Sequence, residues 1–169
     1  MEQSWLIRDA RIADAGRLRE LGVAGWETTY AGFLRPENRR AYLAGPFWSV
    51  ERLRALIAAH DCSTLVAETN DHVAGFLTLE PHPSGTIELT RFYVDPDERG
   101  RGLGAALWRH ALAGRDAGDT PTILVNVFGD NHDGRRFYER LGFTLCEETT
   151  TTVGDQTVYD VWYRLVIDA

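Results

Sequence analysis

The spacing of apolar and polar residues changes several times along the chain, and each change predicts a new element of secondary structure. Residues 4–9 alternate loosely, which is typical of a strand, and residues 11–23 then place apolar side chains at helical spacing. Residues 26–48 are rich in aromatic side chains but are broken by glycine and proline, so we expect a loop with short helical pieces. A second helix is predicted over residues 50–60.

Three strands in succession are predicted for the middle of the chain. Residues 62–68 and 73–80 are rich in β-branched and apolar side chains, and an Asn-Asp pair between them favours a tight hairpin turn. A turn at residues 81–85 leads to a third run, residues 86–94. Because such short connections join antiparallel neighbours, the three runs predict an antiparallel meander.

After residue 95 the pattern alternates between helices and strands. The elements predicted there are a helix over residues 103–117, a strand over 122–127, a helix over 131–141 and a closing hairpin of residues 142–149 and 156–166. A threonine run at residues 149–152 suits a strand at least as well as a linker. The order of elements predicts an α+β fold with a largely antiparallel sheet, parallel where a helix crosses over, in a single domain over residues 1–169.

Length, composition and charge narrow the class of protein. The chain has 169 residues, of which 44% are hydrophobic, and this is enough to bury the core of one domain. No apolar run approaches the roughly 18 residues that cross a bilayer, and the first residues lack the layout of a secretory signal. We therefore expect a soluble cytoplasmic protein with no membrane partner. The net charge of −7 argues against a nucleic-acid partner and suits a neutral or cationic ligand better.

The cysteines and histidines give little support to a metal site. Cys62 and Cys146 have no Cys-x-x-Cys or Cys/His spacing, so we expect reduced, buried packing residues rather than metal ligands or a disulfide. The five histidines share no spacing, and none is assigned to catalysis. We therefore expect no bound metal.

A glycine-rich loop between a strand and a helix carries the strongest chemical signal. The strand stops at a proline, and Gly100, Gly102 and Gly104 then open the next helix. Such glycines let the backbone approach a ligand, and the free N–H groups of the first helical turn attract anions such as a diphosphate. Arg99 and Arg101 would add positive charge at the rim of this site. The alternative is that the three glycines only shape a tight turn.

Two other nucleotide-binding patterns compete for this loop. Residues 100–105 satisfy the dinucleotide-binding pattern G-x-G-x-x-A. In a dinucleotide fold, however, the first glycine follows its strand almost directly, whereas five residues separate Val94 from Gly100 here. The Gly-Lys-Ser or Gly-Lys-Thr of a phosphate-binding P-loop does not follow either. Neither alternative fits the spacing.

Two passages together resemble the GNAT superfamily of N-acetyltransferases. The coenzyme-binding signature of that family is Arg or Gln, two residues, Gly, one residue, then Gly or Ala, and its three fixed places hold Arg99, Gly102 and Gly104. Residues 131–143 resemble the family's N-x-x-A-x-x-F-Y-x-x-x-G-F helix, with Gly134 in place of the alanine. With the matching order of elements, the resemblance covers nearly the whole chain and is loosest over the first 50 residues.

The resemblance implies a fold, a cofactor and a reaction. The implied fold is a mixed, largely antiparallel seven-stranded sheet flanked by about four helices. The implied reaction is direct transfer of the acetyl group of acetyl-CoA, a co-substrate, to an amine. Family members often dimerise, so a homodimer is a further expectation. The residues implied in coenzyme binding are Phe92, Tyr93, Val94, Arg99, Gly100, Arg101, Gly102, Leu103, Gly104, Asn131 and Tyr138.

The resemblance also assigns chemical roles. The backbone N–H of Phe92 would polarise the thioester carbonyl, and Tyr138 occupies the position of the general acid, although a core tyrosine is the alternative. Glu88 lies eleven residues before Arg99, where several family members carry a base, and strand alternation predicts it on the face of Phe92. The alternative for Glu88 is a solvated or ion-paired strand carboxylate. Asn131 is expected either to bind the pantetheine arm or to cap its helix.

The acceptor is less well defined by the sequence. Four residues after the first predicted helix, where the family places an acceptor-binding wall, are candidates: Trp26, Glu27, Tyr30 and Phe33. Glu27 could attract a cationic amine, whereas the aromatic side chains could equally form hydrophobic core. We expect a small-molecule amine rather than a protein acceptor. The rival function is an acyl-CoA-binding sensor without turnover, and a tyrosine at the acid position favours the enzyme.

Overall fold

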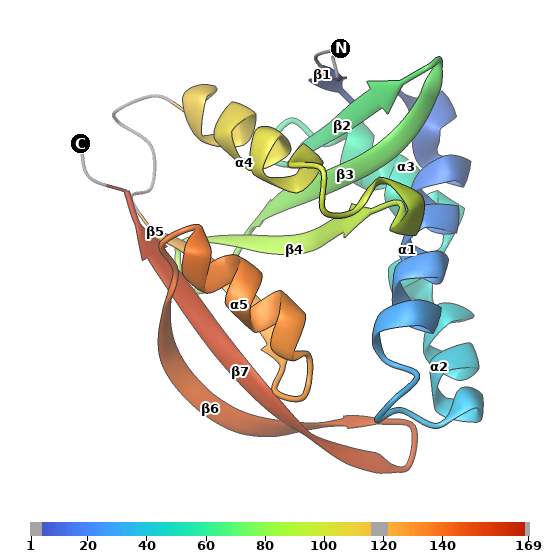
Figure 1. Ribbon diagram of the computed structural model, residues 1–169, viewed down its shortest axis with the longest axis vertical. Helices are drawn as coiled ribbons and strands as arrows, with labels where there is room; N and C mark the ends of the chain where they lie inside the picture. Colours follow the sequence, from blue (N-terminus) through green and yellow to red (C-terminus); the bar gives the residue numbers. More distant parts are fainter. Residues whose placement is uncertain (1–4, 116–121, 168–169) are drawn as a thin grey trace.

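The computed structural model describes residues 5–115 and 122–167. Their strands form one mixed sheet in the order β1-β2-β3-β4-β5-β7-β6 (Figure 1). The strands are β1 (Leu6–Asp9), β2 (Ser63–Thr69), β3 (His72–Pro81), β4 (Ile87–Val94), β5 (Thr122–Phe128), β6 (Thr144–Val153) and β7 (Gln156–Val166). All neighbouring strands are antiparallel except β4 and β5. The predicted α+β fold with a seven-stranded, largely antiparallel sheet is therefore confirmed.

Five α-helices lie within the described residues, one more than the sequence predicts. They are α1 (Ala15–Thr29), α2 (Pro36–Leu43), α3 (Val50–Ala58), α4 (Leu103–Ala113) and α5 (His132–Arg140). The additional helix, α2, lies in the aromatic-rich stretch that was expected to hold only short helical pieces. The predicted end of α4 at residue 117 lies outside the described residues. None of the described helices is long and apolar enough to cross a membrane.

Helix α1 ends six residues later than predicted, because tertiary contacts override two glycines of low helix propensity. A β-carbon on Gly22 would lie 2.0 Å from the ring of Trp48, and one on Gly25 would lie 2.5 Å from the ring of Tyr93. Glycine costs about 1 kcal/mol relative to alanine inside a helix, but here only glycine leaves room for the two aromatic rings. Trp26 and its neighbours are therefore helical and do not belong to a loop.

A tight turn closes the hairpin of β2 and β3 as the sequence predicts. Asn70 and Asp71 both have positive φ, 46° and 64°, between the paired residues Thr69 and His72. Positive φ at both central positions is typical of the type I′ turn. The threonine run that was left open between strand and linker is strand, because β6 continues to Val153 before its turn.

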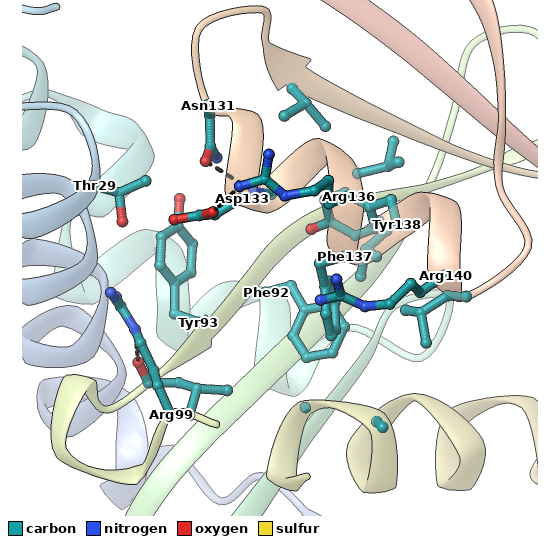
Figure 2. Close-up of a pocket in the computed structure, with 18 of the residues that line it drawn as sticks. Thr29, Phe92, Tyr93, Arg99, Asn131, Asp133, Arg136, Phe137, Tyr138 and Arg140 are labelled. Carbon is teal, nitrogen blue, oxygen red and sulfur yellow. Dashed lines mark hydrogen bonds and ion pairs between the residues drawn. The ribbon is translucent and has the colours of Figure 1, made fainter. Parts of the chain in front are cut away.

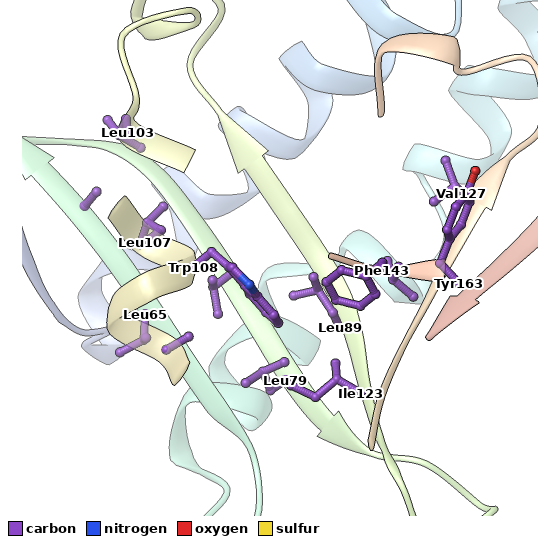
Figure 3. Packing of buried hydrophobic residues seen from close by; sticks show 14 of the residues in the cluster. Leu65, Leu79, Leu89, Leu103, Leu107, Trp108, Ile123, Val127, Phe143 and Tyr163 are labelled. Carbon is purple, nitrogen blue, oxygen red and sulfur yellow. The ribbon is translucent and has the colours of Figure 1, made fainter. Parts of the chain in front are cut away.

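The two faces of the sheet bury two separate hydrophobic clusters. Helices α4 and α5 cover one face, whose core includes Leu89, Leu107, Trp108 and Phe143 (Figure 3). Helices α1, α2 and α3 cover the other face around a second cluster that includes the fully buried Trp48. Figure 1 shows the same division, with α4 and α5 on the near side and α1–α3 grouped together. The sheet is thus a central layer between two helical layers.

A buried arginine joins the first helical layer to the sheet. Arg91 of β4 is 1% exposed, and its guanidinium lies 3.8 Å from the centre of the Phe47 ring. Its Nη1 donates to Glu80 Oε2 at 2.9 Å, and its Nη2 donates to the backbone oxygen of Phe47 at 2.7 Å. Because a planar guanidinium can stack and donate at once, Arg91 holds the segment between α2 and α3 against β4.

Strand β4 contains the two irregularities that shape the site. Within the described residues it pairs with β5 at two positions, Ile87 with Ile123 and Glu88 with Leu124, and then separates from β5. Its pairing with β3 slips by one residue between Thr78 and Leu79. Such a bulge interrupts the alternation of side chains. The parting of β4 and β5 leaves one edge of β4 without a strand partner.

The two cysteines are free thiols, but they are not the buried packing residues that the sequence suggests. Cys62 is partly exposed, and Cys146 is exposed on the outer strand β6. Cys146 coincides with the register slip between Leu145 and Glu147. In the part of the chain that the structure describes, no group of three or more His, Cys, Asp or Glu residues is arranged to hold a metal ion.

Candidate functional site

A cavity of about 1140 Å³ lies where β4 and β5 separate. Its walls come from both strands, the loop before α4, helix α5 and the end of α1 (Figure 2). Cavities for small ligands usually measure about 300–1,000 Å³. The size and the position between two strands therefore suit an elongated ligand that extends along β4.

The unpaired edge of β4 directs backbone groups into this cavity. The N–H of Asp95 donates to the backbone oxygen of Ala74 on β3 at 2.7 Å. In an antiparallel pair the backbone groups point alternately toward and away from the partner, so those of Phe92 and Val94 point away from β3. Both residues line the cavity. Of these groups, the Val94 oxygen accepts from Arg99 Nε at 3.4 Å. An extended ligand with amide groups can therefore pair with β4 as an added strand would.

The glycine loop meets the cavity at the N-terminus of α4. Gly100 and Gly102 have φ of 74° and 86°, in the left-handed region that favours glycine. Gly102 is also the N-cap of α4, and as a glycine it has no side chain to accept from the first N–H groups of the helix. A β-carbon on Gly104 would lie 3.2 Å from the ring of Phe137 on α5. The loop thus presents free N–H groups and the positive end of a helix dipole, which together attract anions.

The arginines predicted at the rim differ in position. Arg99 lines the cavity, where its Nη2 donates to a threonine hydroxyl at the end of α1 at 3.3 Å. Arg101 is not among the residues that line it, but its side chain pairs at 2.7 Å with Glu98, which does line it. A role for Arg101 at the rim therefore stays a prediction. Arg136 and Arg140, one turn apart on α5, also line the cavity, and Arg136 pairs there with Asp133 at 2.5 Å.

Helix α5 and its N-cap place two predicted residues beside the cavity. Asn131 caps the helix, since its Oδ1 accepts from the N–H of Gly134 at 3.0 Å. The Asn131 side chain folds so closely over Gly134 that a β-carbon there would lie 2.4 Å from Nδ2, which accounts for a glycine at this position. Two turns later, Tyr138 lines the cavity with its ring 6.4 Å from that of Phe92. Burial raises the pKa of Tyr138 above its usual value, so the hydroxyl keeps its proton at neutral pH.

Glu88 does not lie on the face of Phe92, contrary to the prediction from alternation. The bulge near Thr90 places both Leu89 and Phe92 against the core beneath α4 and α5, so the neighbouring Glu88 faces the α1–α3 side. Glu88 is not among the residues that line the cavity. Burial raises the pKa of Glu88, with nearby His82 opposing the shift. This carboxyl group therefore lies behind the cavity, on the far face of the sheet.

The four candidate acceptor residues separate into one that lines the cavity and three that do not. Tyr30 lines it. Trp26 is buried core, stacked on Tyr42 at 4.3 Å, and its Nε1 donates to Tyr93 Oη at 3.1 Å. Phe33 packs in the same aromatic cluster. Glu27 pairs with an arginine of α2 at 3.2 Å, so its charge is already engaged. For Trp26 and Phe33 the hydrophobic-core alternative therefore describes the structure.

Comparison with known proteins identifies the family. Residues 26–143, more than half of the chain, match the model of the Acetyltransferase (GNAT) family. The chain belongs to the GNAT acetyltransferase family.

Relatives of known name resemble parts of this GNAT chain. It is 44% identical over 78 residues to a GCN5-like protein acetyltransferase of Mycobacterium tuberculosis, which covers 46% of this chain and 38% of that protein. It is 30% identical over 132 residues to a mycothiol acetyltransferase of a Nocardioides species, which covers 70% of this chain and 42% of that protein. The GNAT chain thus spans less than half the length of these two relatives.

Solved structures resemble nearly the whole GNAT chain. The PaiA N-acetyltransferase of Thermoplasma acidophilum, solved with coenzyme A, superposes with a TM-score of 0.80 at 25% identity and covers 94% of this chain and 98% of that one. YncA of Salmonella typhimurium, solved with acetyl-CoA, has a TM-score of 0.70 at 20% identity, and covers 98% of this chain and 95% of that one. The latter likeness concerns the fold alone.

Several residues that line the cavity of this GNAT chain were not predicted. Besides Arg136 and Arg140, they include Thr28, Asp130, His132 and Asn126. The spacing of four between the two arginines places them on one helix face, and this signal was available. Asn126 was also visible as a polar residue within the apolar strand of residues 122–128. The sequence pointed to the end of α1 through Tyr30, but it gave no sign of Thr28, whose place depends on how that helix packs against β4.

Proposed function

We propose that this GNAT chain is an acetyl-CoA-dependent N-acetyltransferase that transfers the acetyl group directly to the amine of a small molecule. We further propose that it acts in the cytoplasm and that its 169 residues carry the site as a single domain. One observation carries the proposal: a single cavity is lined by the unpaired edge of β4, the glycine loop and Tyr138. These are the three parts that a coenzyme with a diphosphate, an amide-bearing arm and a reactive thioester requires.

The residues present fit such a coenzyme. The N–H groups that begin α4 and the guanidinium groups of Arg99, Arg136 and Arg140 would bind its phosphates. The backbone groups of Phe92 and Val94 would pair with its amide groups. The coenzyme supplies the activated acetyl group, and the chain supplies orientation and proton transfer.

Three groups of the chain would act on the reaction. The N–H of Phe92 would donate to the carbonyl oxygen as negative charge develops there, an effect worth about 3 kcal/mol. The Tyr138 hydroxyl would donate to the sulfur as the C–S bond breaks and the C–N bond forms. Glu88, whose pKa is raised by burial, would take the ammonium proton through water from the α1–α3 side. One ammonium and one thioester thus give one amide, one thiol and one released proton.

The small-molecule acceptor is supported by two observations. Several relatives are named mycothiol acetyltransferases, a name that denotes a small-molecule acceptor. Another relative is named a protein acetyltransferase, so a protein acceptor is also tested. The net charge of −7 favours a neutral or cationic acceptor. Both kinds of acceptor therefore belong in the test.

The proposal is tested in two steps. Calorimetry with coenzyme A and acetyl-CoA should show binding, and no heat at millimolar concentration would refute the coenzyme site. Release of the coenzyme thiol is then measured with spermidine, glucosamine, phenylalaninamide and a lysine-containing peptide as acceptors. Binding without thiol release from any of them would favour the rival function, an acyl-CoA sensor.

Direct transfer has its own test, because the chain contains no lysine. Intact-protein mass spectrometry after incubation with acetyl-CoA alone should show no added acetyl group. An acetyl group on Cys62 or Cys146 would instead indicate a covalent route, which the direct mechanism excludes.

A further inference from the structure

Asn126 lies where the cavity ends between β4 and β5. It is two residues beyond Leu124, the last residue of β5 that pairs with β4, and its exposed side chain lines the cavity. Val125 and Val127 belong to the core beneath α4 and α5, so alternation turns Asn126 toward the α1–α3 face. Asn126 therefore meets the cavity from the side opposite to α5.

Hydrogen bonds fix which end of the Asn126 amide faces the cavity. Its Nδ2 donates to Asp160 Oδ2 at 2.8 Å and to the backbone oxygen of Val161 at 3.3 Å. Both N–H bonds of the amide are thus used on β7. A flipped amide would place Oδ1 against two acceptors, so the observed orientation is the stable one. The Asn126 oxygen, to which no described residue donates, is left for the N–H of a ligand.

A buried aspartate at position 160 is unfavourable for the stability of the fold, which suggests that its role is to hold Asn126. The Asp160 side chain is 5% exposed, and within the described residues Oδ1 has no hydrogen-bond partner. The carboxylate receives one side-chain hydrogen bond, from Asn126, and it forms no ion pair with any described residue. Burial raises its pKa, and the bond from Asn126 opposes that shift. A buried carboxylate without a cation opposes folding, and such groups concentrate at functional sites.

We propose that the carbonyl oxygen of Asn126, held in place by the carboxylate of Asp160, receives an N–H of the acceptor's ammonium group and positions it for attack. This inference rests on the proposed acetyltransferase function. Asn126 is then a substrate-binding residue and Asp160 is its positioning residue. The negative charge behind Asn126 makes a cationic primary amine the best acceptor, because an ammonium brings both the donor and the opposite charge.

The location of Glu88 agrees with this assignment. Glu88 pairs with Leu124 across the last β4–β5 contact, and paired residues direct their side chains to the same face. The proposed base and Asn126 are therefore diagonal neighbours on the α1–α3 face. The acceptor would approach from that face while the coenzyme extends along β4 on the side of α5.

Two pairs of variants test the proposal. Asn126→Leu removes the carbonyl oxygen, and Asp160→Val removes the group that orients it, whereas Asp160→Asn keeps an acceptor for Asn126 Nδ2 but removes the charge. Asp155→Ala is the control, because Asp155 accepts from Asn38 Nδ2 at 2.9 Å in another asparagine–aspartate contact, at the β6–β7 turn outside the cavity. KM and kcat are measured with the best amine of the panel, the coenzyme A Kd by calorimetry, and Tm by thermal unfolding.

The expected result separates acceptor binding from coenzyme binding and from folding. Asn126→Leu and Asp160→Val should raise KM for the amine about 10- to 100-fold, the range for a charge-assisted hydrogen bond. The coenzyme A Kd should stay within about twofold, and Asp160→Val should not lower Tm, since it removes a buried charge. Asp160→Asn should restore KM to within about threefold of the wild type, and the control should leave KM unchanged.

Other outcomes would refute this inference but leave the proposed function standing. A raised coenzyme A Kd with unchanged amine KM would assign Asn126 to the coenzyme, and an Asp160→Asn variant as impaired as Asp160→Val would refute the positioning role. If no amine of the panel is acetylated, the function fails instead. The inference is then decided by the Asn126 side-chain amide resonances, which should shift when spermidine is added to the coenzyme A complex; unchanged resonances would overturn it.

Discussion

Replacing Tyr138 with phenylalanine should abolish most of the turnover and leave the fold unchanged. The ring packs against Phe92, Phe137 and Phe143, and phenylalanine keeps these contacts. The hydroxyl has no hydrogen-bond partner among the described residues, so its loss should change the free energy of unfolding by less than about 0.5 kcal/mol. Loss of a general acid lowers kcat by about 10²- to 10⁴-fold, which corresponds to about 3–5 kcal/mol in the barrier.

A second tyrosine provides the matched control. The Tyr163 hydroxyl accepts from Arg135 Nε at 3.0 Å and donates to Glu139 Oε1 at 2.8 Å, and its side chain is fully buried. Tyr163→Phe removes both contacts with charged groups and should lower the free energy of unfolding by about 2 kcal/mol. Since Tyr163 does not line the cavity, kcat should stay within about twofold.

The assay combines three measurements on both variants. Thiol release at saturating acetyl-CoA and amine gives kcat, calorimetry gives the coenzyme A Kd, and urea unfolding gives the free energy of unfolding. The reasoning is refuted if the Tyr138 variant keeps wild-type kcat. It is also refuted if that variant unfolds as easily as the Tyr163 variant, since its lost activity would then reflect a weakened fold.

Three further predictions concern the base, the glycine loop and the buried arginine. Glu88→Gln should lower kcat/KM about 10²-fold at neutral pH. Because the base acts deprotonated, the wild-type rate should rise with pH through the raised pKa of Glu88. A pH profile of the variant should lack this rise. Gly102→Ala, at a φ of 86°, should lower the free energy of unfolding by about 1 kcal/mol and raise the coenzyme A Kd. Gly16→Ala, with no atom within 4 Å of the added β-carbon, should instead raise the free energy of unfolding by about 0.5 kcal/mol, as measured by urea unfolding. Arg91→Met should lower the free energy of unfolding by about 2 kcal/mol, because Glu80 loses its buried partner but keeps Arg52 at 2.7 Å; a loss under 1 kcal/mol would contradict this account.

Local rules explain why so much of the fold was predictable. The Asn-Asp turn needs only two residues that tolerate positive φ, and the helix over residues 132–140 begins at an asparagine that caps its own first turn. Gly100 and Gly102 likewise indicated the loop before α4, where both have positive φ. In each case the cause and the residue that shows it lie within a few positions of one another.

Where the local rules failed, a distant part of the chain decided. Alternation placed Glu88 on the wrong face, because the bulge depends on how β4 pairs with β3. The sequence ended α1 too early, because the rings that its glycines accommodate come from Trp48 and Tyr93.

The sequence by itself determined the order of elements, the glycine loop and the tyrosine two turns into α5, since periodicity, turn chemistry and capping are short-range effects. Only the tertiary structure decided which groups meet in the cavity. Asn126 and Asp160 are 34 positions apart and touch because β5 pairs with β7. The separation of β4 from β5 is likewise a property of the sheet as a whole: among the described residues β5 pairs with β7 along its length and with β4 at two positions.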